Sequence, residues 1–283
     1  MNIKTIAVIG AGTMGCGIAH VACAGGFETL LQDISDEMLK KSKSIMQENF
    51  HKAVERNLIN RDEAEKTTAR LTITRELNTA VRHADFAIEA IPEIIEAKLE
   101  LFSKIDKICA PEVIFASNTS ALSITEMAAV TTRPQRFIGM HFFNPVHKMK
   151  LVEIVRGLET SPETIETTKA VAEQMGKESV TIKESPGFIT SRINALIGNE
   201  AFYLLQEGIA SAEEIDKAIK LGLNHPMGPF EMVDLVGLDT RLNILKFLHQ
   251  TLGEKYRPCP LMEQYVEAGR LGRKVGRGVY EYS

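Results

Sequence analysis

The sequence predicts an α/β fold in which a mostly parallel β-sheet with helices on both faces is followed by an all-helical C-terminal domain. Short apolar runs of strand type alternate with segments of helical spacing through the first two thirds of the 283 residues. Such alternation is typical of a parallel sheet covered by helices. After residue 187 almost every segment has helical spacing. We therefore expect one domain over residues 1–185 and a helical domain over residues 186–283.

The N-terminal elements follow from apolar runs and the residues that end them. Residues 6–9 form a short apolar run, as in strands buried on both faces. Residues 14–24 then have helical spacing, and residues 28–33 predict a second strand. Ser35 is a suitable N-cap for a long charged helix that continues to about residue 58. We expect this helix to form a helical excursion from the sheet near residues 36–70.

The remaining elements continue the alternation. Strands are expected at residues 71–74, 86–90, 113–117, 137–140, 151–155 and 179–182. Helices are expected at residues 96–110 and 163–175 between them. In the C-terminal domain, apolar residues at helical spacing predict helices at 188–205, 212–221, 238–252 and 261–268.

Composition excludes several classes of protein. The 33 basic and 37 acidic residues give a formal charge of −4, unlike the basic balance of nucleic-acid or anionic-membrane binders. The four cysteines have no metal-binding spacing, so we expect no metal site, no disulfides and a cytoplasmic location. Glycines interrupt the uncharged stretch at residues 5–27, so it is neither a signal peptide nor a membrane span.

The segment Gly10-Ala11-Gly12-Thr13-Met14-Gly15 has the GxGxxG pattern of a Rossmann-like dinucleotide-binding domain. It follows a strand and opens a helix, whose N-terminal N–H groups suit phosphates. Gly10 permits the tight turn, Gly12 lets the backbone approach a pyrophosphate, and Gly15 lets the helix pack close to the strand. The predicted cofactor-binding residues of this turn and of the next strand are Gly10, Gly12, Thr13, Met14, Gly15 and Asp33.

Asp33 selects between the two nicotinamide cofactors. At the end of the second strand it would accept hydrogen bonds from the adenosine ribose and repel a 2′-phosphate. NAD is therefore expected and NADP is disfavoured. The alternative is a glycine-rich turn without a ligand, because a Rossmann-like fold can be reused without its cofactor.

Polar residues at the expected carboxyl ends of several strands form a second group of candidates. Ligands of parallel sheets bind beyond these ends, where Glu93, Ser120, His141 and Asn144 are expected, with Glu153 in the following strand. A buried carboxylate beside a histidine would fix its tautomer and stabilise the imidazolium, as a general base for alcohol oxidation requires.

Each of these residues also has a structural interpretation. His141 could be a hydrogen-bonded structural histidine, and Ser120 could be a turn or cap residue. Glu153 could pair with Lys148 or Lys150.

Six further segments resemble the L-3-hydroxyacyl-CoA dehydrogenase family. They are Ala-Ser-Asn-Thr-Ser at 116–120, Gly-Met-His-Phe-Phe-Asn-Pro at 139–145, Met-Lys-Leu-Val-Glu-Ile at 149–154, Ser-Pro-Gly-Phe-Ile at 185–189, His-Pro-Met-Gly-Pro-Phe-Glu at 225–231 and Leu-Gly-Arg-Lys-Val-Gly-Arg-Gly-Val-Tyr at 271–280. With the glycine turn they extend over essentially the whole chain. By its length the chain is most similar to bacterial members that act on 3-hydroxybutyryl-CoA.

The resemblance implies NAD-dependent oxidation of (S)-3-hydroxyacyl-CoA, with 3-hydroxybutyryl-CoA as the expected substrate, and the reverse reduction of acetoacetyl-CoA. His141 would take the C3 hydroxyl proton while hydride passes to NAD, and Glu153 would orient and charge-stabilise His141. Ser120 would hydrogen-bond the reacting oxygen, and Asn144 would help to hold the thioester end. Ser191 stands where many members have an asparagine that contacts this oxygen.

The resemblance also implies further contacts and partners. The expected NAD contacts outside the glycine turn are Ala90, Glu93, Lys98, Ser120, Asn144 and Lys274. Lys52 and Arg56, at i and i+4 of the long helix, are expected to contact the CoA part of the substrate; a solvated helical face with Glu48 and Glu55 is the alternative. The helical C-terminal domain is expected to bind substrate and to form a homodimer, and the pathway to be fatty acid or butanoate metabolism.

Two other functions remain open from the sequence. One is a dehydrogenase for another 3-hydroxy acid or acyl-CoA, such as 3-hydroxyadipyl-CoA. The other is a non-catalytic relative, since some lens crystallins resemble this family.

Overall fold

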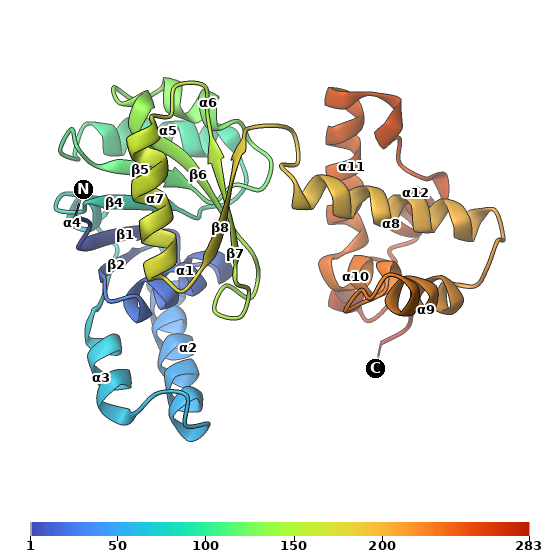
Figure 1. Cartoon of the computed structure of the whole chain (residues 1–283), viewed down its shortest axis with the longest axis horizontal. Coiled ribbons are helices and arrows are strands. Elements are labelled where there is room, and N and C mark those ends of the chain that lie inside the picture. Colours follow the sequence, from blue (N-terminus) through green and yellow to red (C-terminus); the bar gives the residue numbers. More distant parts are fainter. Residues whose placement is uncertain (1, 283) are drawn as a thin grey trace. The chain divides into compact units, whose positions relative to one another are not determined.

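The computed structural model describes residues 2–282 and divides into two compact units, Met1–Glu184 and Ser185–Ser283. Figure 1 shows an α/β unit and an all-helical unit. The predicted fold class, a mostly parallel sheet with helices followed by an all-helical part, is confirmed.

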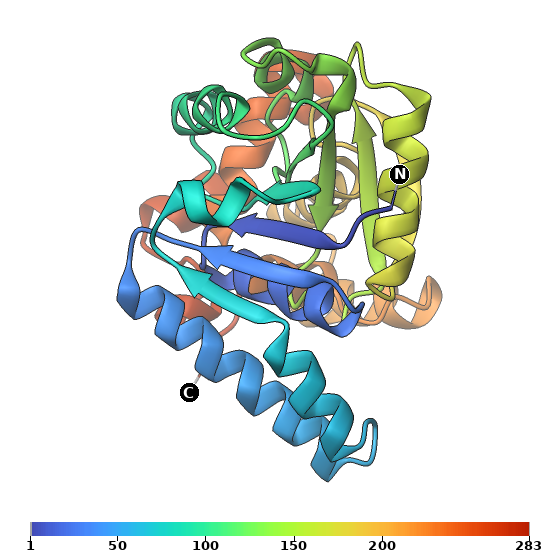
Figure 2. The same ribbon diagram turned by 90° about the vertical axis from the view of Figure 1, so that its left-hand side faces the viewer.

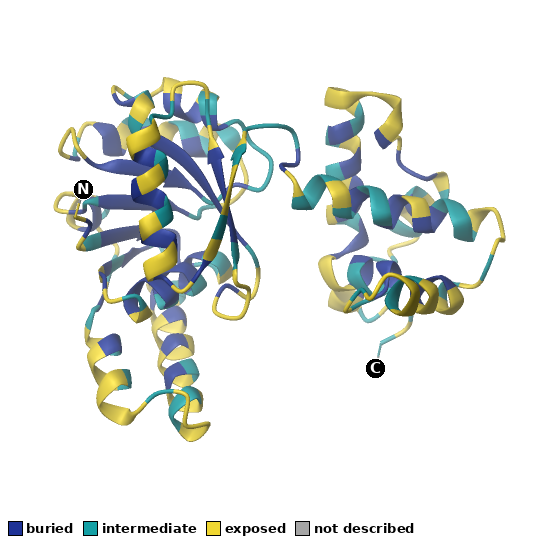
Figure 3. Cartoon of the chain, viewed as in Figure 1, coloured by how far each residue is buried: buried dark blue, intermediate teal, exposed yellow. Residues whose placement is uncertain are grey.

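An eight-stranded sheet forms the core of the first unit, in the order β3-β2-β1-β4-β5-β6-β7-β8. All neighbouring strands are parallel except β6 and β7, which are antiparallel. The strands are β1 (Thr5–Ile9), β2 (Glu28–Gln32), β3 (Leu71–Thr74), β4 (Phe86–Glu89), β5 (Ile114–Ser117), β6 (Phe137–Phe142), β7 (Leu151–Arg156) and β8 (Glu178–Lys183). Figure 3 shows that the sheet is mostly buried.

Helices cover this sheet. They are α1 (Thr13–Ala24), α2 (Asp36–Glu55), α3 (Arg61–Ala69), α4 (Leu77–Val81), α5 (Ile95–Asp106), α6 (Ile124–Ala129) and α7 (Pro162–Gln174). Ser35 caps α2 as expected, because its side chain accepts a hydrogen bond from the Met38 N–H. Helices α2 and α3 pack together and form the helical excursion beside β3, which Figure 2 shows at the lower edge of the sheet.

Several predicted boundaries differ from the structure, and three of them affect candidate site residues. Strand β6 continues through Phe142, so His141 lies inside the strand and not after it. The reason is its antiparallel partner β7, which hydrogen-bonds the chain beyond Met140. Helix α2 ends at Glu55, and Arg56 is its C-cap. Asp33 lies one residue beyond β2.

The second unit contains α8 (Thr190–Gln206), α9 (Ala212–Gly222), α10 (Pro229–Val236), α11 (Leu238–Leu252) and α12 (Pro260–Glu267). Its core includes Phe202, Phe230, Leu245 and Tyr256, which are almost completely buried. Helix α10, which has eight residues, was not expected from the sequence. Its start is nevertheless encoded by Pro229 at the first helical position, where the missing N–H costs nothing.

Two glycines of the turn between β1 and α1 are required by close backbone contacts. Gly10 has φ +101°, and a Cβ there would lie 2.6 Å from the carbonyl oxygen of Ala90. A Cβ on Gly15 would lie 1.7 Å from the carbonyl oxygen of Gly10. A Cβ on Gly12, by contrast, would meet nothing within 4 Å. The turn therefore needs Gly10 and Gly15 for folding, whereas the fold leaves open space above Gly12.

We expect Gly15→Ala to lower the free energy of unfolding by roughly 3 kcal/mol, because the added methyl group overpacks a backbone contact that cannot yield easily. Gly12→Ala is the matched control and should cost less than about 1 kcal/mol, as for an ordinary N-cap change. Guanidinium denaturation followed by circular dichroism measures both. Equal losses for the two variants would contradict this account of the turn.

Candidate active site

The centre of the site is a histidine–carboxylate pair on neighbouring strands. The antiparallel register of β6 and β7 makes His141 and Glu153 cross-strand partners, and the two side chains lie on the same face of the sheet. The distance from His141 Nδ1 to Glu153 Oε2 is 2.7 Å. Glu153 is fully buried and His141 is 7% exposed. In this structure the partner of the Glu153 carboxylate is thus the His141 ring.

This contact determines which ring nitrogen can act as a base. An ionised carboxylate can only accept hydrogen bonds, so Nδ1 of His141 must donate its proton to Glu153. In a neutral imidazole the other nitrogen, Nε2, then carries the lone pair. A buried carboxylate also stabilises the imidazolium that forms when Nε2 takes a proton. The pair therefore has the chemistry of an oriented general base.

Ser120 lies in the turn that follows β5, and Glu93 fixes that turn. Glu93 Oε1 accepts hydrogen bonds from the Thr119 hydroxyl at 2.5 Å, from the Ser120 N–H at 2.9 Å and from the Ser120 hydroxyl at 3.3 Å. On the other side, Glu93 Oε2 lies 3.2 Å from the Lys98 ammonium. Glu93 and Ser120, which the sequence places after different strands, are thus in direct contact.

Beneath this turn lies a buried ion pair that the sequence did not predict. The Lys98 ammonium lies 2.5 Å from Oε1 of Glu89, and both side chains are at most 1% exposed. Glu89 Oε2 accepts a 2.5 Å hydrogen bond from the Ser117 hydroxyl. Burial raises the pKa of the Glu89 carboxyl, against the opposing effect of Lys98 and the hydrogen-bond donors. An acidic residue within the otherwise apolar segment Phe-Ala-Ile-Glu is the signal that could have revealed it.

The glycine turn has the features that a dinucleotide pyrophosphate needs. Gly12 is the N-cap of α1, and no acidic residue occupies the first turn of that helix, so its positive dipole end is not neutralised. Asp33 holds the turn: its Oδ2 accepts a 2.7 Å hydrogen bond from the Ala11 N–H, and its Oδ1 accepts one from the Ser35 N–H at 2.9 Å. With the open space at Gly12, these residues fit NAD. Ala90 lies directly against Gly10.

A cavity of about 300 Å³ adjoins the glycine turn. Its walls are the start of α1, one face of α2 and the segment at residues 144–147, and they include Gly12, His20 and Asn144. Lys177 secures this segment, because its buried ammonium donates to the carbonyl oxygens of Val146 at 2.5 Å and Met149 at 2.8 Å. Asn144, the first residue of this segment, lines the cavity together with Gly12 of the glycine turn.

His20 lines the same cavity without charge at neutral pH. Its ring stacks on Phe50 with centroids 4.2 Å apart and an interplanar angle of 12°. Burial lowers the pKa of His20 to about 4, and the nearby positive charges of His147 and Lys177 act in the same direction.

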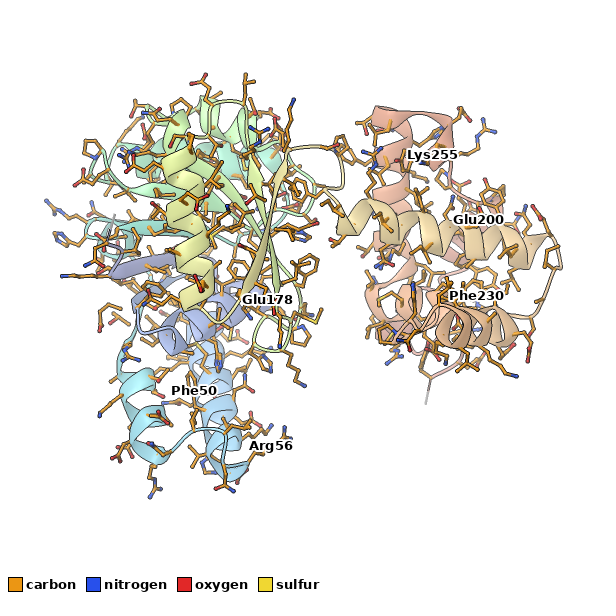
Figure 4. The ribbon with its side chains drawn as sticks, viewed as in Figure 1. Phe50, Arg56, Glu178, Glu200, Phe230 and Lys255 are labelled. Atoms are coloured by element: carbon orange, nitrogen blue, oxygen red, sulfur yellow. The ribbon has the colours of Figure 1, made fainter. Side chains whose placement is uncertain are left out.

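The other predicted site residues lie elsewhere. Lys52 on α2 is exposed and pairs with Glu48 at 2.6 Å, which is the contact expected of a solvated face. Arg56 ends the helix, as Figure 4 shows. Ser191 is the second residue of α8. Lys274 contacts both carboxylate oxygens of Asp239 at 2.6 Å within the helical unit.

Neither a metal site nor a membrane helix is found in the part of the chain that the structure describes. Among residues 2–282, no three His, Cys, Asp or Glu side chains are grouped so that they could hold a metal ion. Within the same residues, no helix is both long and apolar enough to span a bilayer.

Two family models together match nearly all of the chain. The model for the NAD binding domain of 3-hydroxyacyl-CoA dehydrogenase matches residues 5–185, and the model for the C-terminal domain of 3-hydroxyacyl-CoA dehydrogenase matches residues 187–282.

Individual relatives match at full length. The chain is 49% identical over 283 residues to a protein of Bacillus subtilis named as a probable 3-hydroxybutyryl-CoA dehydrogenase, covering 100% of this chain and 98% of that protein. It is 44% identical over 281 residues to the 3-hydroxybutyryl-CoA dehydrogenase of Bradyrhizobium diazoefficiens, covering 99% and 96%. The crystal structure of (S)-3-hydroxybutyryl-CoA dehydrogenase from Ralstonia eutropha superposes with a TM-score of 0.97 at 44% identity, with 100% of both chains covered.

We expect His20 to make the protein less stable in acid. Its folded-state pKa of about 4 lies below the unfolded value of about 6.5, so the unfolded state binds the proton first and stability falls as the pH drops from 6.5 towards 4. At pH 5 the loss due to His20 is about 2 kcal/mol. His20→Phe should remove that part of the difference in unfolding free energy between pH 7 and pH 5.

The control for this experiment is the exposed His83, whose replacement by Gln should leave the pH dependence of unfolding unchanged. If His20→Phe shows the same loss of stability in acid as the unmodified protein, the buried neutral state of His20 is refuted.

Proposed function

Because the chain belongs to the 3-hydroxyacyl-CoA dehydrogenase family, we propose that it interconverts (S)-3-hydroxybutyryl-CoA and acetoacetyl-CoA with NAD. The family consists of NAD-dependent oxidoreductases, and the relatives cited above are named for the four-carbon substrate. The observation that carries the proposal is the 2.7 Å contact between His141 Nδ1 and Glu153 Oε2, because it leaves Nε2 as the basic nitrogen of the ring.

In this mechanism His141 Nε2 accepts the proton of the C3 hydroxyl group. The nicotinamide of bound NAD supplies the acceptor for the hydride that leaves C3. Glu153 keeps the ring in one tautomer and balances the charge of the imidazolium. In the direction of reduction, the His141 imidazolium returns the proton to the C3 oxygen. Because Glu153 is fully buried, little water competes for its hydrogen bond to the ring.

Ser120 is proposed to donate its one hydroxyl proton to the C3 oxygen in place of the 3.3 Å hydrogen bond to Glu93, while the Ser120 N–H bond to Glu93 keeps the turn in position. Asn144 is proposed to hold the thioester end of the substrate, from the wall of the cavity that it helps to form. Ser191 replaces the asparagine of many family members near the reacting oxygen, and this assignment remains a prediction.

The cofactor is proposed to lie on the glycine turn. Backbone N–H groups at the start of α1, including those of Thr13 and Met14, face the pyrophosphate, and Asp33 accepts from the adenosine ribose. NAD contacts of Ala90, Glu93 and Lys98 are proposed from the family resemblance. The Lys98 ammonium itself is buried and paired with Glu89 and Glu93. The NAD contact of Lys274, which pairs with Asp239, stays a prediction.

The CoA part of the substrate is proposed to follow α2. Lys41, Ile45 and Asn49 line the cavity beside the glycine turn, and Lys52 continues the same helical face three residues later. Arg56, at the C-cap, extends this line by one more turn. Binding of the CoA phosphates by Lys52 requires that its exposed pair with Glu48 opens, which costs little in water.

A homodimer formed through the helical unit and a cytoplasmic location complete the proposal. Several large apolar side chains of this unit are exposed, among them Ile193, Leu221 and Leu223, and an exposed apolar surface of this kind is typical of an interface. Sedimentation equilibrium tests the dimer.

The cytoplasmic location is supported by the four cysteines, which are unpaired and buried, as expected in a reducing compartment.

The related candidate substrates differ in the length and end group of their acyl chain. Comparison of kcat/KM for acetoacetyl-CoA, for 3-oxoadipyl-CoA and for longer 3-oxoacyl-CoA thioesters tests the four-carbon assignment. The proposal predicts the highest value for acetoacetyl-CoA. The non-catalytic, crystallin-like alternative predicts no turnover of any of them, and the intact His141–Glu153 contact argues against it.

We expect His141→Ala to lower kcat for NADH-dependent reduction of acetoacetyl-CoA by roughly a thousandfold, because the proton donor is lost. Glu153→Gln should lower kcat by roughly a hundredfold or more, since the amide removes the charge that stabilises the imidazolium. The decrease in NADH absorbance measures both. His83→Ala, at an exposed histidine, should keep full activity. An active His141→Ala variant would refute the assigned base.

We expect Asp33→Ala to lower kcat/KM for NADH much more than for NADPH, because the ribose acceptor is lost together with the charge that repels a 2′-phosphate. The ratio of the two values should fall by roughly tenfold or more. Parallel assays with the two reduced cofactors measure this ratio. An unchanged ratio would refute the role of Asp33 in cofactor choice.

A further inference from the structure

An unbroken series of charged contacts leads from the interior of the sheet to Ser120. It starts at Glu89, the last residue of β4, passes through the Lys98 ammonium at 2.5 Å, and continues to Glu93 at 3.2 Å. Glu93 then holds the backbone and hydroxyl of Ser120. Only the outer members of the series reach the surface, because Glu89 and Lys98 are buried and the Glu93 side chain is 38% exposed.

Glu89 is fixed from several sides. Its Oε1 also accepts a 2.7 Å hydrogen bond from the Ile91 N–H, and its Oε2 accepts from the Ser117 hydroxyl. The Ser117 hydroxyl oxygen in turn accepts a 3.3 Å hydrogen bond from the Thr119 N–H, inside the turn that carries Ser120. Two routes therefore join Glu89 to this turn, one through Lys98 and Glu93 and one through Ser117.

A carboxylate at this position is costly for folding alone. Two charges taken out of water lose several kcal/mol of solvation each, and well-packed apolar residues of similar size often replace such pairs without loss of stability. The neighbours of Glu89 in its strand, Phe86, Ala87 and Ile88, are all completely buried apolar residues. The Glu89–Lys98 pair is connected through Glu93 to Ser120, which is proposed to contact the substrate. This connection suggests that the buried pair serves the reaction and not only the stability of the fold.

We propose that Glu89 is a positioning residue for the reaction: it anchors both the Lys98 ammonium and the Ser117 hydroxyl, which together set the orientation of Glu93 and of the Thr119–Ser120 turn, and thereby the position of the Ser120 hydroxyl. This inference rests on the proposed function of Ser120 as a hydrogen-bond donor to the C3 oxygen. Without the charge on Glu89, Lys98 keeps Glu93 as its anionic partner and draws that carboxylate inward, away from the Thr119–Ser120 turn. Misplacement of a donor by about 1 Å can cost up to about a hundredfold in rate.

The test replaces Glu89 by Gln, which keeps the shape and removes the charge. Glu89→Gln is expected to lower kcat for acetoacetyl-CoA reduction roughly tenfold or more, with KM for acetoacetyl-CoA changed less than about twofold. Because Glu93 and Lys98 are also proposed NAD contacts, kcat is measured at saturating NADH. An interaction that is strongest in the transition state produces this split. Lowered stability by itself would reduce the amount of folded enzyme but not kcat per folded molecule, so rates are normalised to NADH-binding sites.

Asp106→Asn supplies the matched control. Asp106 forms another buried ion pair of the first unit, with Arg133 Nε 2.7 Å from its Oδ1, at the opposite end of α5 from Lys98. This variant should lose stability and keep kcat. If Glu89→Gln does not fold, Ser117→Ala, which deletes only the hydroxyl contact to Glu89 and the turn, should lower kcat several-fold with KM unchanged.

The outcomes separate this inference from the proposed function. An unmodified protein that does not reduce acetoacetyl-CoA overturns the proposed function itself. An active unmodified protein whose Glu89→Gln variant, or whose Ser117→Ala variant if the first does not fold, keeps full kcat overturns only the positioning role. A decrease of kcat in Asp106→Asn equal to that in Glu89→Gln would also overturn it, because any buried charge would then have the same effect.

Discussion

The antiparallel pairing of β6 with β7 is the constraint on which the site depends. It is the one antiparallel pairing between neighbours in the eight-stranded sheet described over residues 2–282. The reversal of direction lets a short connection return the chain beside β6, and the register then sets Glu153 opposite His141. Cross-strand partners have Cβ atoms about 5 Å apart, which is the separation that a histidine–carboxylate hydrogen bond needs. The sheet itself therefore orients the base, without help from a mobile loop.

Around this pair the first unit places charges where apolar residues would be expected, and it gives each one a partner. Glu153 meets His141, Glu89 meets Lys98, and the ammonium of Lys177 meets two carbonyl oxygens. Buried charges of this kind cost solvation energy. In return they act in a medium of low polarity, where fixed charges and dipoles stabilise a developing charge without reorganisation. All three hold groups at or beside the strand ends where the substrate and cofactor are proposed to lie.

Local features of the sequence were sufficient to predict part of the fold and part of the candidate site. The glycine turn, Asp33 and most strands depend on residues that are neighbours in the chain, and the structure has the predicted turn between β1 and α1. The direction of β7 and the length of β6 depend on pairing between distant segments, so His141 was expected after its strand and lies inside it. The Glu89–Lys98 pair was not predicted because the contacts that connect it to the site are made by Ser117 and Glu93, which lie on other segments. The end of α2 before Arg56 reflects a local break at Asn57, whose φ is +55°.

The tautomer of His141 is the most direct test of this account, because the proposed chemistry needs the proton on Nδ1 and the lone pair on Nε2. Long-range ¹H–¹⁵N NMR of ¹⁵N-histidine-labelled protein reports the protonation of each ring nitrogen, and comparison with a His141→Asn variant assigns the signals. For the neutral His141 ring the account predicts a protonated Nδ1 and an unprotonated Nε2. The opposite tautomer would contradict it, because Glu153 would then not orient the base.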